Sequence, residues 1–231
     1  MDDPSTAMIF AAGFGTRMGK LTLNRPKPLI GVAGRALLDH ALDLTHAAGL
    51  RAVVNAHYKA DMIAAHVQDR PDTEVIIEQP EILDTGGGLK SALPQLGSGP
   101  VYTLNSDAAW AGPNPFECLR AAWQPSRMGA LLLLVPQERT VGYTRVGDFA
   151  ADAQGRLTRN TSGMIYTGAQ VLHTDGLADI NEASFSLNVL WDQMLPEQQL
   201  FGVEYPGFWA DVGTPDGIAL AEQMLEQHAD V

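Results

Sequence analysis

Residues 7–18 read AMIFAAGFGTRM, and this stretch decides the fold. Its first six residues form a continuous apolar run, which is typical of a strand buried on both faces of a sheet. Gly13 and Gly15 follow directly, and glycines after a strand let backbone N–H groups approach a phosphate closely. A glycine pair taken alone is equally typical of a plain tight turn. The stretch therefore predicts an α/β protein whose first turn either binds phosphate or only reverses the chain.

Apolar segments beyond this strand alternate between strand and helix patterns. Further strands are predicted at residues 51–56, 73–79, 101–105, 130–135, 164–172 and 208–212. Helices are predicted at residues 36–48, 59–68, 115–123 and 186–195, from residue 87 to 93, and from Pro215 onward behind a Thr214 cap. After residue 136 the pattern changes to a hairpin with arms at 143–149 and 156–160. The order predicts one α/β domain over residues 1–231, with a mixed, mostly parallel central sheet and helices on both faces.

The composition excludes several classes of protein. The chain has 231 residues and a formal net charge of −12, which argues against a nucleic-acid binder. Its longest apolar run, residues 130–135, is far shorter than a membrane span needs. Cys118 is the single cysteine, so an internal disulfide and a cysteine-cluster metal site are excluded. We expect a reduced, soluble, cytoplasmic protein.

Charge is unevenly distributed along the chain. Residues 4–38 contain five Lys or Arg and no acidic residue, whereas residues 160–231 contain eleven acidic residues and no Lys or Arg. A basic segment in an acidic protein suits a small, highly charged anion, and the acidic end offers carboxylates to a metal. The alternative interpretation is a solvated face plus a solubilising tail.

Two familiar nucleotide motifs do not fit the glycine turn. The dinucleotide pattern G-x-G-x-x-G requires glycine where the chain has Met18, and in the Walker pattern Gly15 and Gly19 are one residue too close. A dinucleotide site also needs an acidic residue roughly 20 positions after the turn, and the first acidic residue is Asp39. These departures disfavour a nicotinamide oxidoreductase, which is the rival enzyme class.

The basic segment resembles a family signature. Residues 11–29, AAGFGTRMGKLTLNRPKPL, are similar to the G-x-G-T-R and P-K-P motifs of sugar-1-phosphate nucleotidyltransferases. The resemblance implies that Arg17 holds the departing pyrophosphate and that Lys27 holds the α-phosphate or the sugar phosphate. The prolines on either side fix the backbone around Lys27. The same resemblance implies nucleotide contacts from Ala11, Ala12, Gly13, Gly15 and Thr16.

Three further segments resemble motifs of this family. Residues 79–89, QPEILDTGGGL, are similar to the L-G-T-A-G segment, with Asp84 in place of its first glycine. Residues 104–107, LNSD, resemble N-G-D, and residues 208–215, FWADVGTP, resemble W-x-D-[IV]-G-T-P. The resemblance implies nucleotide contacts from Gln79, Gly86, Gly87 and Asn105, and Mg²⁺ binding by Asp107 and Asp211. Two carboxylates, with phosphate oxygens and water, suit the ligand requirements of magnesium.

The acceptor side of the resemblance is less complete. Together with LDTGGG, the short chain favours the branch of N-acetylmuramate-1-phosphate uridylyltransferases. Many family members carry an E-K-P motif whose lysine holds the sugar phosphate, whereas this chain reads Leu-Thr-Arg-Asn at residues 157–160. Arg159 is the candidate replacement, and Gly147 and Gly168 match glycines that line the family's sugar pocket.

The resemblance implies a Rossmann-like nucleotidyltransferase fold and a defined reaction. Its nucleotide-binding half would span about residues 7–136 and its sugar-binding half about residues 137–231. The implied enzyme transfers a nucleotidyl group from UTP or another NTP to a sugar 1-phosphate, with N-acetylmuramate 1-phosphate as one candidate acceptor and Mg²⁺ as cofactor. Arg17, Lys27 and Asp107 would be the catalytic residues, with no nucleic-acid or membrane partner, and the oligomeric state is open. The alternative function is a non-catalytic sugar-nucleotide sensor or regulatory subunit.

Overall fold

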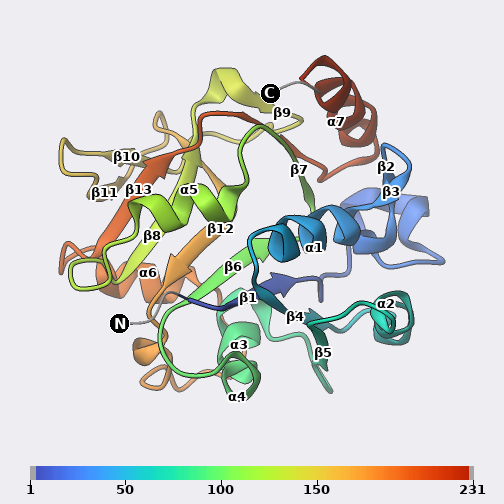
Figure 1. The fold of residues 1–231 in the computed structure, drawn as a ribbon, viewed down its shortest axis with the longest axis horizontal. Helices are drawn as coiled ribbons and strands as arrows, with labels where there is room; N and C mark the ends of the chain where they lie inside the picture. The colour runs from blue at the N-terminus through green and yellow to red at the C-terminus, as the bar shows by residue number, and fades with distance from the viewer. Residues whose placement is uncertain (1–3, 229–231) are drawn as a thin grey trace.

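The structure, a computed structural model, describes residues 4–228. Its centre is a seven-stranded sheet with the strand order β13-β8-β12-β6-β1-β4-β5 (Figure 1). β12 runs antiparallel to both of its neighbours, whereas the pairs β1–β4, β1–β6, β4–β5 and β8–β13 are parallel. The prediction of a mixed, mostly parallel sheet is confirmed. The strands are β1 (Thr6–Phe10), β4 (Arg51–Ala56), β5 (Thr73–Ile77), β6 (Val101–Asn105), β8 (Ala130–Val135), β12 (Ile165–Leu172) and β13 (Leu200–Glu204).

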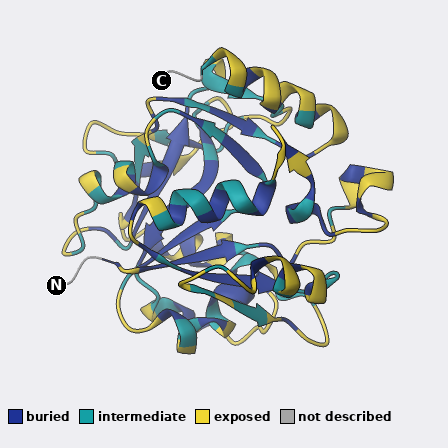
Figure 2. Ribbon diagram, turned by 45° about the vertical axis from the view of Figure 1, so that its right-hand side comes forward, coloured by how far each residue is buried: buried dark blue, intermediate teal, exposed yellow. Residues whose placement is uncertain are grey.

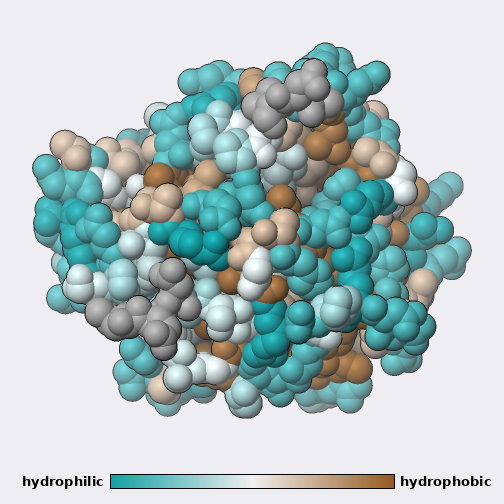
Figure 3. All heavy atoms as spheres, in the orientation of Figure 1, coloured by the Kyte–Doolittle hydropathy of each residue, from teal (hydrophilic) through white to brown (hydrophobic). Residues whose placement is uncertain are grey.

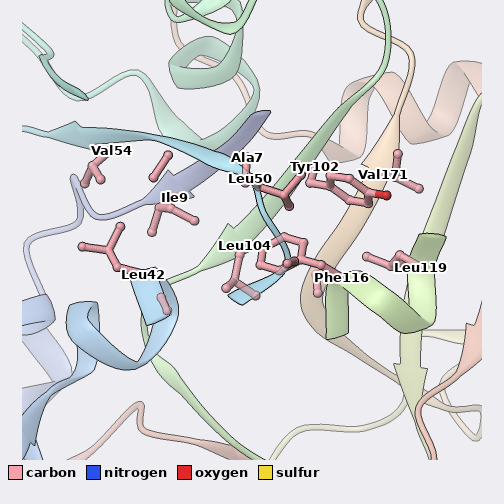
Figure 4. Close-up of a cluster of buried hydrophobic side chains, with 14 of the residues drawn as sticks. Ala7, Ile9, Leu42, Leu50, Val54, Tyr102, Leu104, Phe116, Leu119 and Val171 are labelled. Atoms are coloured by element: carbon pink, nitrogen blue, oxygen red, sulfur yellow. The ribbon is translucent and has the colours of Figure 1, made fainter. Parts of the chain in front are cut away.

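Helices cover both faces of this sheet because alternate strand residues point to opposite sides. On β1, Ala7 and Ile9 join one buried cluster, whereas Met8 joins another on the opposite face. Figure 4 shows the first cluster, and Figure 2 shows that most of the sheet is buried. The first cluster is closed by α1 (Leu37–Ala47), α2 (Ala60–Val67) and α5 (Pro115–Ala122), and the second by α3 (Asp84–Ser91), α4 (Leu93–Leu96) and α6 (Asn188–Met194).

A second, three-stranded sheet brings the C-terminal part of the chain to the carboxyl end of β6. It consists of β7 (Ala108–Ala111), β14 (Phe208–Asp211) and β9 (Thr140–Val141), with β14 in the middle. The helix α7 (Pro215–Gln227) contacts all three strands. Two hairpins complete the fold, β2 (Gly31–Val32) with β3 (Arg35–Ala36), and β10 (Phe149–Ala151) with β11 (Leu157–Arg159).

Several local predictions need correction. The helix predicted from residue 87 begins at Asp84, and the predicted hairpin arm at 143–149 is a loop that becomes a strand only at Phe149. The turn-rich stretch contains two 3₁₀ helices, η1 (Thr16–Thr22) and η2 (Lys27–Leu29). Thr214 occupies the N-cap position of α7, but its side chain makes no capping hydrogen bond.

The molecular surface agrees with the composition. Hydrophilic residues cover much of the face in Figure 3, and the apolar residues on that face are scattered. Within residues 4–228, no helix combines the length and the apolar character that a bilayer crossing demands.

Candidate functional site

Two pockets adjoin at the carboxyl ends of β1 and β6, where ligands of open α/β sheets bind. Each has a volume of about 310 Å³. The first pocket is lined by the first turn, and also by Asn55 and Pro28. The second pocket is lined by the β10–β12 region and α6, and includes Asp211. The residues common to both pockets are Phe10, Arg17, Asp84, Thr85, Asn105 and Asp107.

The first turn presents free donors to the first pocket. Within residues 4–228, the N–H groups of Gly13 and Gly15 make no hydrogen bond, and both residues line the pocket. Gly15 has φ +63°, and a Cβ there would lie 2.8 Å from the Cβ of Lys27. Glycine therefore permits both the left-handed backbone and the close packing of Lys27. Ala11, Ala12, Thr16 and Arg17 also line this pocket, as does Lys27.

A buried polar network holds this turn against the neighbouring loop. The Ala11 N–H donates to Asn55 Oδ1 at 2.8 Å, and Asn55 Nδ2 donates to Glu78 Oε1 at 2.6 Å. The other oxygen of Glu78 accepts the Leu83 N–H at 2.8 Å. Asn55 and Glu78 are only 2% and 3% exposed, so each hydrogen bond offsets a costly desolvation. The network was not predicted, because no local pattern links residues from β1, β4 and the loop after β5.

A substitution at Gly88 tests whether the Asn55–Glu78 network is rigid. A Cβ at Gly88 would lie 2.6 Å from Glu78 Oε1 and 2.8 Å from Asn55 Nδ2. Alanine normally stabilises a helix by about 1 kcal/mol relative to glycine. Any loss of stability would therefore come from the steric clash and not from helix propensity. We expect Gly88→Ala to lower the free energy of unfolding by roughly 1–3 kcal/mol, measured by urea denaturation. The control Gly31→Ala, where the nearest atom is 3.9 Å away, should change it by less than about 0.5 kcal/mol. Equal stability of Gly88→Ala and wild type would contradict a rigid network.

Asp107 follows β6 and is bound by Lys27. Lys27 Nζ donates to Asp107 Oδ2 at 2.8 Å, and Lys27 is 8% exposed. Ser106, which stands where the family motif has glycine, has no positive φ. Its hydroxyl instead donates to the Phe10 carbonyl oxygen at 2.7 Å. Serine therefore fits this turn without strain and ties the end of β6 to the end of β1.

The register of the small sheet brings Asp211 beside Asp107. Asp211 is the last residue of β14 and pairs with Ala108, and the Val212 N–H donates to the Asp107 carbonyl oxygen at 2.9 Å. Within residues 4–228, the Asp211 carboxylate has no hydrogen bond or salt bridge. Burial, and after it the negative charge of Asp107, raises the pKa of Asp211 above its ordinary value. The site therefore holds two adjacent carboxylates whose repulsion is not fully compensated.

Arg17 lies at the junction of the two pockets and close to Asp211. A Cβ at Gly213 would be 2.9 Å from Arg17 Nη1 and 3.0 Å from Asp211 Oδ2. Gly213 has no side chain and therefore leaves room for the Arg17 guanidinium, which comes from η1, and for the Asp211 carboxylate, which comes from β14.

Five residues expected at the site do not line either pocket. Gln79 is exposed on the loop after β5, while the N–H groups of Gly86 and Gly87 donate to the Phe185 carbonyl oxygen at 2.8 and 3.0 Å. Gly168 has φ +86°, and a Cβ there would lie 2.6 Å from the Asn105 amide nitrogen. A Cβ at Gly147 would meet the Gly163 carbonyl oxygen at 2.2 Å. In this structure the four glycines lie in close contact with other parts of the protein, and their ligand contacts stay predictions.

Asp84 is a site residue that the expected contacts did not include. It has φ +58°, a conformation that side chains rarely adopt, and its Oδ1 accepts the Thr85 N–H at 2.6 Å. The signal was present in the sequence, because Asp84 stands where the resembling motif has glycine. A left-handed backbone explains why glycine suits that position.

The second pocket carries two further cations and an aromatic wall. Arg145 and Arg159 line it together with Tyr166, Trp191 and Trp209. The predicted residue Arg159 is therefore at the pocket, at the end of β11.

This arrangement defines a class of protein: a Rossmann-like α/β protein with free N–H donors and paired carboxylates at the carboxyl ends of its strands, where ligands of such folds bind. Comparison with known proteins extends this class to a family. Residues 7–174 match the MobA-like NTP transferase domain, and the chain belongs to that family.

Relatives named as sugar-1-phosphate nucleotidyltransferases align with almost the whole chain. The chain is 38% identical to N-acetylmuramate alpha-1-phosphate uridylyltransferase of Caulobacter vibrioides, over 97% of this chain and 98% of the relative. It is 31% identical to the enzyme of the same name from Neisseria meningitidis, over 90% and 93% of the two chains. It is 28% identical to a probable mannose-1-phosphate guanylyltransferase of Arabidopsis thaliana, of which it spans 62%. The prediction of a sugar-1-phosphate nucleotidyltransferase is confirmed, and with it that the chain is an enzyme.

Solved structures confirm the fold. HddC from Yersinia pseudotuberculosis, complexed with GMP-PN, matches with a TM-score of 0.73 at 20% identity, over 95% of this chain and 98% of that one. A putative glucose-1-phosphate thymidylyltransferase from Bacillus anthracis matches with a TM-score of 0.77 at 15% identity, over 98% and 96%.

Proposed function

We propose that this enzyme transfers the uridylyl group of UTP to N-acetylmuramate 1-phosphate with the aid of Mg²⁺, releasing pyrophosphate. The two uridylyltransferases that resemble it share 38% and 31% identity with this chain, whereas the guanylyltransferase shares 28%. Residues 7–136 would supply most of the nucleotide site and residues 137–231 most of the acceptor site. A cytoplasmic role in cell-wall recycling is part of the same proposal.

One observation carries the proposal. The pairing of β14 with β7 places Asp211 beside Asp107, at the mouth of a turn with free N–H donors. Anion-binding donors next to paired carboxylates suit a triphosphate held against a divalent cation.

The residues present fit a magnesium ion. Asp211 is partly buried, and within residues 4–228 its carboxylate has no hydrogen bond or salt bridge, so it is free to bind a cation. The described residues bring no group of three or more His, Cys, Asp or Glu together, so the protein would supply only two of the ligands. Asp107 and Asp211 would hold Mg²⁺, with phosphate oxygens and water completing its ligands. When bound, the ion would supply positive charge that offsets the charge of the α-phosphate region.

The chain's own residues would align and neutralise two anions that repel each other. The N–H groups of Gly13 and Gly15 would hold triphosphate oxygens. Arg17, which lines both pockets, would neutralise the departing pyrophosphate, and Lys27 would hold a phosphate oxygen near the α-phosphorus. The attacking phosphate oxygen is already ionised near neutral pH, so the reaction requires no general base.

A substrate panel tests the proposal. Purified enzyme with Mg²⁺ would be offered UTP, GTP, dTTP and CTP, each with the 1-phosphates of N-acetylmuramate, N-acetylglucosamine, mannose and glucose. We expect the highest kcat/KM, measured by pyrophosphate release, with UTP and N-acetylmuramate 1-phosphate. A clear preference for GTP, or for mannose 1-phosphate, would overturn the substrate assignment while keeping the class of reaction.

A further inference from the structure

The second pocket is lined by three cations with different surroundings. Arg17 lines both pockets, whereas Arg145 and Arg159 line only the second. Lys27 lines the first pocket and is engaged with Asp107 at 2.8 Å. Arg145 and Arg159 are therefore the two candidates for an anion that enters only the acceptor side.

Arg159 is already engaged by the protein. Its Nη2 donates to Asp192 Oδ1 at 2.8 Å, and its guanidinium lies 4.9 Å from the ring centre of Phe149 and 5.9 Å from that of Trp191. Arg159 therefore already has a carboxylate partner and two aromatic contacts. An incoming phosphate would have to compete with Asp192 for this side chain.

Arg145 has no such carboxylate partner. Within residues 4–228 it forms no salt bridge, and its guanidinium lies 5.1 Å from the ring centre of Tyr143. The Tyr143 ring packs against Trp209, with ring centres 5.8 Å apart, and its hydroxyl donates to Asp148 Oδ2 at 3.3 Å. Arg145 is thus supported by an aromatic platform while its donors stay available.

The small sheet sets the position of Arg145 relative to Asp211. Val141 of β9 pairs with Ala210 of β14, one residue before Asp211. The chain then turns at Gly142, which has φ +74° and where a Cβ would lie 2.6 Å from the Asp211 carbonyl oxygen. The loop that carries Arg145 therefore leaves the sheet directly beside Asp211.

We propose that Arg145, and not Arg159, binds the phosphate of the sugar 1-phosphate acceptor. The second pocket contains four carboxylates, which would repel an acceptor dianion: Asp84, Asp107, Asp148 and Asp211. A free guanidinium beside Asp211 offsets that repulsion and offers paired donors to phosphate oxygens. The inference rests on the acceptor half of the proposed function.

The test compares single variants in both catalysis and binding. We expect Arg145→Ala to lower kcat/KM for the sugar 1-phosphate by roughly 10- to 100-fold, with the KM for UTP changed by less than about twofold. Isothermal titration of Arg145→Ala with N-acetylglucosamine 1-phosphate should show a similar loss of affinity. Titration with N-acetylglucosamine, which has no phosphate, should show no difference between Arg145→Ala and wild type. Arg145→Lys should fall between wild type and Arg145→Ala, because it keeps the charge but loses the paired donors. Arg35→Ala, which removes an exposed arginine paired with Asp43 outside both pockets, is the matched control.

The other outcomes distinguish failure of this inference from failure of the proposed function. An unchanged acceptor KM and unchanged titration in Arg145→Ala, with an active wild type, would overturn it and leave the proposed function intact. A large loss in Arg159→Ala alone would assign the phosphate to Arg159. A loss confined to N-acetylmuramate 1-phosphate would show that Arg145 binds the sugar's carboxylate instead. If wild type turns over no sugar 1-phosphate, the proposed function fails, and the titration still decides whether Arg145 binds phosphate.

Discussion

Asp211→Asn should lower kcat by about 10³-fold while the folded chain stays at least as stable as wild type. The amide keeps the shape of the side chain but removes the charge that would hold Mg²⁺. Burial and the charge of Asp107 raise the pKa of Asp211, so the ionised carboxylate destabilises the fold at neutral pH. The measurements are pyrophosphate release with saturating substrates and thermal unfolding in the presence of a chelator.

The pH dependence separates this role from a structural one. A folded-state pKa above the ordinary value of 3.8 means that the destabilisation appears as pH rises through the folded-state pKa, and is absent below pH 3.8. The stability advantage of Asp211→Asn should therefore be present at neutral pH and vanish in acid. Asp216→Asn, an exposed position outside both pockets, should keep wild-type kcat. Turnover near the wild-type level in Asp211→Asn would end the metal assignment.

Lys27→Ala is the second variant with a large expected effect, a fall in kcat of about 10²- to 10³-fold with UTP still bound. Lys27 is buried between Gly15 and Asp107, so its loss removes a phosphate-binding cation and leaves Asp107 without its partner. Binding should survive because the free N–H groups of the first turn remain. The measurements are kcat from pyrophosphate release and the Kd of UTP from isothermal titration.

The matched control for Lys27 lies on the same basic segment. Lys20 is exposed, forms no salt bridge within residues 4–228 and lines neither pocket, so Lys20→Ala should keep kcat. Loss of UTP affinity in Lys27→Ala, with an unchanged kcat at saturation, would show that Lys27 binds the ground state only.

Elements with uniform local patterns could be predicted from the sequence. The bounds of β4, β6 and β8 agree with the predicted residues 51–56, 101–105 and 130–135, because each is a short, mostly apolar segment rich in residues that favour strands. β13 was not predicted, since Gly202 interrupts it and its parallel partner β8 lies far back in the sequence. The predicted start of α3 at residue 87 was too late, because consecutive glycines disfavour a helix. In the structure the Phe185 carbonyl oxygen accepts two N–H groups of this glycine segment.

For the site, too, local motifs could be predicted from the sequence, whereas the pairing of distant strands could not. The motifs singled out Lys27, Asp107 and Asp211, and the structure places all three at the pockets, while their roles stay predictions. How the two aspartates meet could not be predicted, because it depends on the pairing of β14 with β7, and β7 was not predicted. Arg145 was missed because residues 143–149 were predicted as a hairpin arm, whereas the structure forms a loop there up to Phe149. The position of Arg145 comes from β9, which pairs with β14 through only two residues.

The antiparallel insertion of β12 has a consequence for how the protein is made. Within residues 4–136, β8 has no neighbouring strand, because both of its partners, β12 and β13, come later in the chain. A nascent chain that has emerged from the ribosome only through residue 136 therefore carries an apolar strand with nowhere to pair. The sheet can be completed only after residue 204 has emerged. We therefore expect folding to be slow and largely post-translational. The exposed strand β8 should be the segment that most needs protection by a chaperone.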